Sequence, residues 1–291
     1  MRNIIINSKN VVPNTNNSRY SYKFPVSQKF EDMQIALGNF NYNQSVFNIT
    51  TTNNNTVFQY QFPTEVNPTT VSMPEGLYRL QDINAYLEFT QFQNKHYLID
   101  GLGNIVYFIS LTVNRVLYGY EISCDPVPTA LPAGWASPVG FPGFPAVAET
   151  PLLIIPSTKI QQLLGFPAAT YPAVAQATTY NLLSPNVPQI FPVSSILLAC
   201  SLVHNDLQYP NQIFYSFLNS DQVAGTPISI TPSEYAFINL DNGYYHSLEI
   251  EILDQNFNPI VLKDPDVLFN LLLCQRCTPI AKSTFYKPLN A

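Results

Sequence analysis

The sequence predicts an all-β fold: a single jelly roll of two packed β-sheets, with short helices in the connections and a Pro/Gly-rich insertion. Most apolar segments alternate with a period of two and are rich in β-branched and aromatic residues, as strands are. Two short segments have helical spacing instead. We expect one domain over residues 25–280, with a polar N-terminal arm at 1–24 and a C-terminal tail at 281–291. A general two-sheet sandwich remains an alternative, because counting strands does not fix their topology.

The N-terminal half begins with the Asn- and Ser-rich arm, which we expect to be extended, either mobile or lying on a neighbour. Strand patterns follow at 28–40, 45–51 and 56–62. A helix is then predicted, because Leu80, Ile83 and Leu87 recur at helical spacing. Asp82 lies near the expected start of this helix, where the macrodipole favours a carboxylate.

The middle of the chain contains a predicted strand pair at 104–124, a long loop and a second helix. The loop or insertion at about 125–151 is crowded with Pro and Gly and contains the only tryptophan, Trp135. Loops of this length inside a domain are usually functional or disordered. The short helix that follows has Ser157 as its expected N-cap and Gly165 as its expected stop. Later strand patterns lie at 194–203, 226–232, 235–240, 245–254 and 267–275.

The charge of the chain limits the classes of partner. Lys and Arg number 13 against 19 Asp and Glu, a net charge of -6, so a basic surface for coating nucleic acid is not expected. Charged residues are only 11% of the sequence, and a surface poor in charge suits contact with other subunits. No apolar run approaches the length of a membrane span, and the first residues do not follow the pattern of a signal peptide.

No pattern of histidines or cysteines predicts a metal centre. His96, His204 and His246 follow no metal-binding spacing, and we interpret them as surface or hydrogen-bonded polar residues. Cys274 and Cys277 form a lone CxxC pair, whereas structural zinc needs four ligands and a redox pair needs a thioredoxin-like context. Plain thiols at the end of a buried strand are the favoured interpretation, with metal and redox roles left open.

Paired carboxylates are the remaining candidates for chemistry. Glu249 and Glu251 share one face of a strand, as the two acids of a glycosidase can, but a solvent-facing strand produces such pairs routinely. Asp264 and Asp266 flank a proline and are interpreted as a turn, because further oxygen ligands for calcium are missing. The sequence therefore predicts no catalytic residue, no cofactor and no metal.

The order of several segments along the chain resembles that of a known family. These segments are 73–87, 157–172, 193–205 and 245–273. Together they are similar to the penton, or minor capsid, proteins of virophages and of Polinton/Maverick-type elements, in particular those of the Mavirus kind. The matching residues are Gly76, Tyr78, Asp82, Ile83 and Asn84 in the first motif, and Leu164, Gly165, Phe166, Tyr171 and Pro172 in the second. Ala169 stands where the family pattern has a glycine, which puts a positive-φ role there in doubt.

The resemblance implies a function and a set of partners. The chain would be a homopentamer at the vertex of an icosahedral virion, in contact with a double jelly-roll major capsid protein. It would be assembled inside the host cell, without catalysis, direct contact with nucleic acid or a membrane span. The candidate shape or interface residues are Gly76, Tyr78, Asp82, Asn84, Trp135, Gly165, Phe166, Tyr171 and Pro172. For the stretch 163–172, an interface role and packing within the subunit's own core both remain open.

Three other functions remain as alternatives. A receptor- or carbohydrate-binding spike module of similar fold would use Trp135 and Phe141 as its contacts. A carbohydrate-active enzyme of β-sandwich type would use Glu249 and Glu251. The third is a trimeric capsid protein, although major capsid proteins of this lineage need two jelly rolls, and 291 residues without a repeat is short for two.

Overall fold

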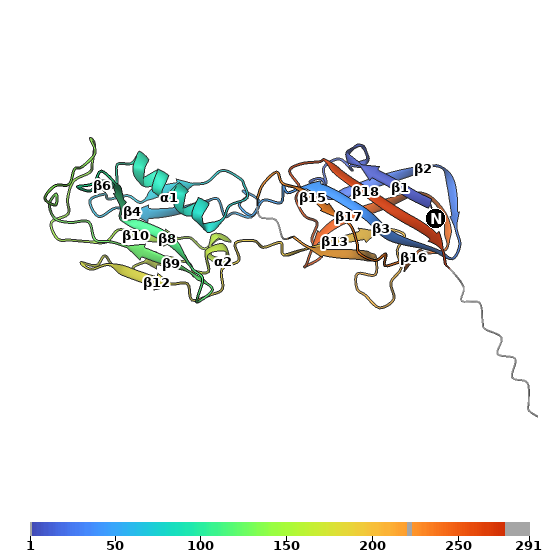
Figure 1. Ribbon diagram of the computed structural model, residues 1–291. Helices are drawn as coiled ribbons and strands as arrows, with labels where there is room; N and C mark the ends of the chain where they lie inside the picture. Colours follow the sequence, from blue (N-terminus) through green and yellow to red (C-terminus); the bar gives the residue numbers. More distant parts are fainter. Residues whose placement is uncertain (1, 220–222, 277–291) are drawn as a thin grey trace, which may run out of the picture. The chain divides into compact units, whose positions relative to one another are not determined.

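The computed structural model describes residues 2–219 and 223–276, which form two compact units (Figure 1). The jelly-roll unit comprises residues 2–44, 195–219 and 225–276. The inserted unit comprises residues 45–194, together with 223 and 224. The expected tail at 281–291 and Cys277 of the CxxC pair lie outside the described residues.

The described part of the jelly-roll unit is built from eight principal strands and one two-residue strand, β16. In chain order they are β1 (Arg2–Asn7), β2 (Arg19–Phe30), β3 (Met33–Asn43), β13 (Ser195–Cys200), β14 (Ile213–Leu218), β15 (Pro227–Ile230), β16 (Ile238–Asn239), β17 (Gly243–Asp254) and β18 (Val267–Gln275). A single turn of 3-10 helix, η1 (Ser8–Asn10), follows β1. All of the strand pairings are antiparallel, so period-two alternation can bury one face of each strand.

The order of these strands is that of a jelly roll. One sheet has the order β1-β18-β3-β15, with β16 also paired to β3, and the other has the order β14-β13-β17-β2. With the eight principal strands numbered along the chain, the two sheets read 1-8-3-6 and 5-4-7-2, the arrangement of two interlocked Greek keys. The predicted single jelly roll of two packed sheets is therefore confirmed within this unit.

Aromatic rings join the two sheets of the jelly-roll unit into one core. Phe269 of β18 stacks on Phe40 of β3 with 4.7 Å between ring centroids, and Tyr20 of β2 meets Phe269 edge-on at 5.3 Å. The ring centroid of Phe217 in β14 lies 5.6 Å from that of Phe40. Because β2 and β14 belong to one sheet and β3 and β18 to the other, the contacts of Tyr20 and Phe217 cross the sandwich. Such ring contacts contribute beyond their buried area.

The expected N-terminal arm at 1–24 is corrected by the structure, since its described residues belong to the jelly roll. β1 pairs antiparallel with β18 along its whole length, and β2 begins within the expected arm. Ile4 and Ile6 of β1 are buried, whereas Ile5 between them is half exposed. A short apolar alternation inside an Asn-rich stretch therefore forms a strand, because a partner strand from the other end of the chain is present.

The inserted unit is built from shorter elements. Its sheets have the orders β11-β10-β4-β5, β12-β9-β8 and β6-β7. The elements are β4 (Val57–Gln61), β5 (Thr69–Ser72), α1 (Leu80–Gln93), β6 (Tyr97–Ile99), β7 (Ile105–Tyr107), β8 (Ile109–Asn114), β9 (Gly119–Cys124), β10 (Leu152–Ile155), α2 (Ile160–Leu164), β11 (Ala169–Tyr171) and β12 (Tyr180–Leu183). Apolar side chains from both helices and from the sheets form one hydrophobic core.

Both predicted helices are present in the inserted unit. α1 buries the three apolar residues whose spacing predicted it. α2 is shorter than expected, because its N-cap is Lys159 rather than Ser157. Gly165 ends α2 with a φ of 78°, as predicted, and a Cβ there would collide with the backbone oxygen of Asn186. This position therefore requires glycine for its conformation and for its space.

The expected domain boundaries also differ from the observed ones. The sequence suggested one domain at 25–280 with an insertion at 125–151, whereas the described chain has two units and the inserted one spans 45–194. Residues 125–151 do form a long connection, between β9 and β10. The expected strand at 45–51 makes only isolated bridges. Apolar alternation predicts a strand but not the sheet that the strand joins. The sequence therefore could not show that these strands belong to two separate units.

Candidate functional site

All nine candidate shape or interface residues lie in the inserted unit. They come from the segment around the start of α1, from the loop between β9 and β10, and from the connection that follows α2. They are Gly76, Tyr78, Asp82, Asn84, Trp135, Gly165, Phe166, Tyr171 and Pro172. Their contacts divide them into four local sets.

The segment before α1 is held by the buried amide of Asn48. The Oδ1 atom of Asn48 accepts the backbone N–H of Tyr78 at 2.8 Å, and its Nδ2 donates to the backbone oxygens of Tyr78 and Ile190, each at 2.7 Å. Gly76 forms an antiparallel bridge with Ile49, and a Cβ on Gly76 would lie 2.7 Å from the ring of Tyr78. Glycine permits this close approach, so Gly76 and Tyr78 shape the chain. Asn48 stands inside the expected strand at 45–51, where no motif distinguishes it as a structural residue.

Two polar residues of α1 fix its start and its place against β8. Asp82 lies in the first turn, as predicted, and its Oδ2 accepts the backbone N–H of Arg79 at 2.7 Å. Asn84 accepts the backbone N–H of Leu111 in β8 through Oδ1 at 2.7 Å, and donates to Oε1 of Glu88 at 2.7 Å. Asp82 satisfies a backbone donor of the helix end, and Asn84 connects the helix to a strand.

The connection that follows α2 packs into the core of its own unit. Phe166 is completely buried, and its ring centroid lies 5.6 Å from that of Tyr171. The Tyr171 hydroxyl donates to the backbone oxygen of Pro167 at 2.9 Å, and the Tyr171–Pro172 peptide bond is cis. Gly165 provides the turn into this segment. The burial of Phe166 agrees with the core-packing interpretation, and the interface role of the stretch stays a prediction.

The aromatic residues of the long loop anchor that loop. Trp135 is half-buried against the core of the inserted unit, and its backbone N–H donates to the oxygen of Pro132 at 3.0 Å. Phe141 lies 6.0 Å from Phe62 of the core and 5.0 Å from Phe144 of the same loop, between ring centroids. These side chains therefore contribute part of their surface to packing within the unit.

A buried histidine in the inserted unit is surrounded by polar and aromatic partners. Nδ1 of His96 lies 2.8 Å from the hydroxyl of Tyr60, Nε2 lies 3.2 Å from Oε1 of Glu65, and the ring stacks on Phe62 at 4.3 Å. Burial lowers the pKa of His96 below its ordinary value, while the Glu65 carboxylate acts in the opposite direction. Because His96 and Tyr60 are both completely buried, the group can stabilise the fold but offers no exposed nucleophile.

One carboxylate and one histidine considered in the jelly-roll unit, Glu251 and His204, have charged partners. Glu251 forms an ion pair with Arg19 of the neighbouring strand β2. The Nε2 atom of His204 lies 2.6 Å from Oδ1 of Asp206, and its Nδ1 lies 3.3 Å from Oδ1 of Asp241. These pairs are exposed or partly exposed, where an ion pair contributes little to stability.

The thiols and the remaining acidic residues also have ordinary surroundings. Burial raises the pKa of Cys124 to about 12 and that of Cys200 to about 11, which makes both thiols poor nucleophiles. Oδ1 of Asp264 accepts the backbone N–H of Asp266 at 2.8 Å, as expected for a turn. Over residues 2–219 and 223–276, the structure has no group of three or more His, Cys, Asp or Glu that could hold a metal ion. The same residues include no helix that is long and apolar enough to span a membrane.

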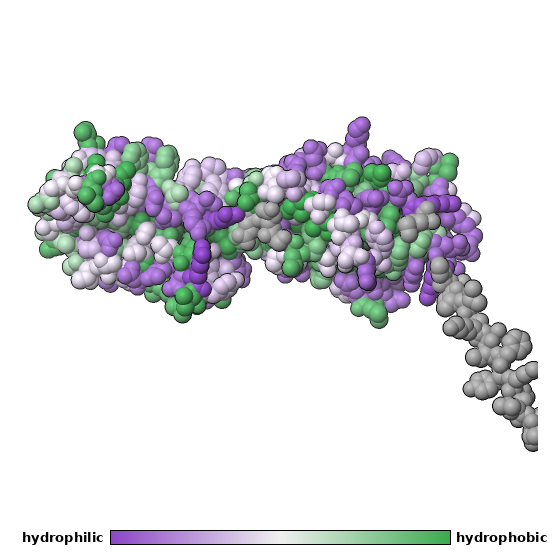
Figure 2. Space-filling view, in the orientation of Figure 1, coloured by the Kyte–Doolittle hydropathy of each residue, from purple (hydrophilic) through white to green (hydrophobic). Residues whose placement is uncertain are grey.

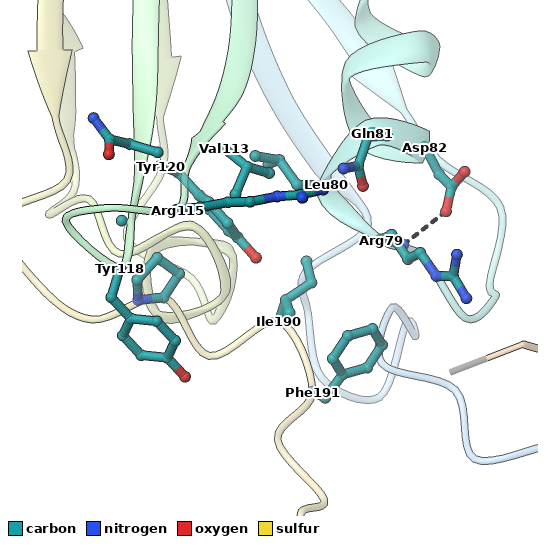
Figure 3. A pocket seen from close by; sticks show the side chains of 13 residues that line it. Arg79, Leu80, Gln81, Asp82, Val113, Arg115, Tyr118, Tyr120, Ile190 and Phe191 are labelled. Atoms are coloured by element: carbon teal, nitrogen blue, oxygen red, sulfur yellow. Dashed lines mark hydrogen bonds between the residues drawn. The ribbon is translucent and has the colours of Figure 1, made fainter. Parts of the chain in front are cut away.

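A surface groove of about 690 Å³ lies in the inserted unit, and sequence analysis missed it (Figure 3). It is bordered by the start of α1, the turn between β8 and β9, and residues 188–191. The groove is lined by Arg79, Leu80, Gln81, Asp82, Val113, Asn114, Arg115, Tyr118, Gly119, Tyr120, Pro188, Ile190 and Phe191. Since these residues come from three separate segments, no local motif could have revealed the groove.

The fold defines an all-β protein in which a single jelly roll carries a second unit inserted between β3 and β13. The chain is similar to the crystal structure of the mavirus penton protein, with a TM-score of 0.41 and 10% identity over 94% of this chain and 99% of that chain. It is also similar to a chain in the cryo-EM structure of the Sputnik virophage, with a TM-score of 0.38 and 12% identity over 94% of this chain and 97% of that chain. No protein-family model and no curated protein matches the sequence. The mavirus protein is of the kind that the two sequence motifs resemble.

Proposed function

We propose that the chain is a structural protein of an icosahedral capsid and forms its pentameric vertex. The observation that carries this proposal is the strand order 1-8-3-6 and 5-4-7-2, a complete single jelly roll assembled from both ends of the chain. A jelly roll alone serves several functions, so the proposal also depends on the order of the motifs that resemble penton proteins.

The mechanism in this proposal is repeated contact between identical subunits. Five copies would close a ring through heterologous interfaces, in which each subunit presents one surface to the next. The chain would also contact a double jelly-roll major capsid protein, and no direct contact with nucleic acid is expected. A surface poor in charge suits such contacts, because few ions must lose their water. The chain would act at the vertex of the virion and would not need catalysis.

The proposed vertex role gives the candidate residues a positioning task. Asn48, Gly76 and Tyr78 hold the segment before α1, while Gly165 and Phe166 hold the connection after α2. Their contacts fix backbone positions inside the inserted unit, and a fixed backbone presents its loops to a neighbour in one arrangement. The proposal therefore treats these residues as determinants of shape.

The receptor- or carbohydrate-binding alternative is less well supported. It required exposed aromatic contacts from Trp135 and Phe141, and both side chains are partly buried against the core of their own unit. On the face drawn in Figure 2, hydrophobic surface is divided into small areas among hydrophilic ones.

The test is the mass of the purified full-length chain in solution. Size-exclusion chromatography with light scattering, over a range of concentrations and at two salt concentrations, should give five times the subunit mass of 32.7 kDa. A stable trimer would contradict the vertex assignment. If the chain is a monomer, it is mixed with a double jelly-roll major capsid protein, and electron microscopy should show fivefold density at the vertices. Shells that form without the chain, or with it at other positions, would also contradict the proposal.

A further inference from the structure

The groove of the inserted unit gathers an unusual share of that unit's positive charge. Residues 45–194 contain four basic residues, Arg79, Lys95, Arg115 and Lys159, against eight acidic ones. Both arginines line the groove, together with one carboxylate, that of Asp82. The unit as a whole is acidic, whereas the charged groups of the groove have a positive balance.

Neither arginine is neutralised by a carboxylate of residues 2–219 or 223–276. Among the described residues, no carboxylate lies within ion-pair distance of the guanidinium of Arg79 or Arg115. The Asp82 carboxylate accepts the backbone N–H of Arg79, at the end of α1. In Figure 3 the side chain of Arg115 extends from the turn between β8 and β9 toward Leu80. The groove therefore offers guanidinium donors that have no acidic partner in the part of the chain that the structure describes.

Apolar side chains lie beside polar ones such as Gln81 and Asn114 in the groove, and others lie on the turn at its border. Ile190 and Phe191 line the groove beside the two arginines (Figure 3). At the tip of the turn between β8 and β9, Val116 is 92% exposed, Leu117 62% and Tyr118 75%. Adjacent exposed aliphatic and aromatic side chains of this kind mark interaction surfaces.

The chemistry of the groove selects one class of occupant. A guanidinium binds a carboxylate with two parallel hydrogen bonds, and the aliphatic rim is matched by aliphatic or aromatic side chains. A polypeptide supplies both within a few residues, whereas an acidic sugar supplies the anion but leaves the aliphatic rim unmatched. We propose that this groove binds an extended segment of another protein chain, in which an Asp or Glu lies next to apolar residues. This proposal stands on the groove alone and does not require a pentamer.

The test is a selection from a random peptide display library on the full-length chain, followed by fluorescence anisotropy with the selected peptides. We expect these peptides to contain an Asp or Glu next to apolar residues. Arg115→Glu should weaken their binding about tenfold or more. Arg115→Lys keeps the positive charge but cannot form the two parallel hydrogen bonds of a guanidinium, and it should weaken binding less. Replacing the acidic residue of the peptide by its amide should weaken binding to the wild-type chain.

Lys159→Glu is the matched control, because Lys159 is an exposed cation of the same unit outside the groove. It should leave peptide affinity unchanged, and thermal unfolding should show that each variant is folded. Arg79→Gln, which keeps the backbone N–H at the start of α1, tests the other side of the groove and should also weaken binding.

Several results would overturn the proposal. They are selected peptides without acidic residues, no selected peptide at all, or binding that is equally strong with Arg115→Glu. Binding of heparin oligosaccharides that depends on Arg115, without peptide binding, would assign the groove to an acidic sugar instead. A change in the mass of a homo-oligomer with Arg115→Glu, again without peptide binding, would make the groove a contact between copies.

Discussion

The jelly-roll unit and the inserted unit are both rich in β-strands, but they differ in how far apart along the chain their paired strands lie. In the jelly-roll unit, β1 and β3 pair with β18, so residues from the two ends of the chain share one sheet. In the inserted unit, every pairing of the named strands lies between residues 57 and 183. The sheets of the first unit therefore combine strands far apart in the chain, whereas the strand pairs of the second lie within one continuous stretch.

The two units also differ in what holds their connections. Rings of Phe40, Phe269 and Tyr20 cross between the long strands of the jelly-roll unit. In the inserted unit, where strands are short, side-chain amides such as those of Asn48 and Asn84 bind the backbone directly. In long strands the sheet hydrogen bonds satisfy most backbone groups, and the core can be apolar. Short strands leave more backbone groups outside the sheets, and buried polar side chains satisfy them.

The variant with the largest expected loss of stability, Phe269→Ala, tests whether the two units unfold separately. Phe269→Ala removes a completely buried ring and should lower the unfolding free energy of the jelly-roll unit by about 3–5 kcal/mol. Trp135, the only tryptophan, lies in the inserted unit, so its fluorescence reports on that unit while circular dichroism reports on both. In urea, part of the dichroism transition should move and the fluorescence transition should not. Leu268→Ala is the control, because Leu268 is a partly exposed neighbour in β18, and it should lower the unfolding free energy by less.

Truncating a buried phenylalanine in the inserted unit should instead shift the fluorescence transition that reports on that unit. Phe166→Ala should lower the stability of that unit by about 3–5 kcal/mol and move the fluorescence transition. If either variant shifted the unfolding transitions of both units together, the two units would unfold as one cooperative body, which would contradict separate unfolding. An unchanged transition combined with failed assembly would instead favour an interface role for Phe166.

A smaller effect is expected from the amide that holds the segment before α1. Asn48→Ala leaves the N–H and the oxygen of Tyr78 without their partner and should cost about 1–3 kcal/mol in the inserted unit. Asn67→Ala, at an exposed position of the same unit, should change stability by less than about 0.5 kcal/mol. Equal effects of the two variants in urea unfolding would show that the amide contacts do not stabilise the unit.

The smallest expected effect is a pH dependence confined to the inserted unit. Because burial lowers the pKa of His96 from 6.5, the unfolded chain takes up a proton more readily than the folded one. Stability should therefore fall as the pH decreases through 6.5 toward the lowered value, with Glu65 reducing the effect. The measurement is the urea transition by Trp135 fluorescence from pH 7.5 to pH 5, compared with His96→Gln. A wild-type slope equal to that of His96→Gln would rule out this role of His96.

Much of the local structure was predictable from residue spacing. The apolar periodicity gave both helices and most strands, and Gly165 marked the end of α2 because only a left-handed residue can turn the chain there. The alternation of Glu249 and Glu251 with buried apolar residues in β17 was also correct. The expected arm was wrong, because two buried isoleucines in β1 carry no signal until β18 is present beside them.

The candidate residues were located but their partners were not. Gly76, Tyr78 and Asn84 were found through their motif, yet Asn48 and Leu111, which bind two of them, lie up to 30 residues away along the chain. The groove was missed entirely, since its lining comes from three segments.

By itself, the sequence determined the local conformations, because each depends on the spacing and the backbone preferences of nearby residues. It also determined the low charge and the all-β class. Only the tertiary structure decided which strands share a sheet, where the second unit is inserted, and that Arg79 and Arg115 line one groove. The physical reason is that strand pairing and side-chain contact join residues far apart in the chain, and a period of two is the same for every possible partner.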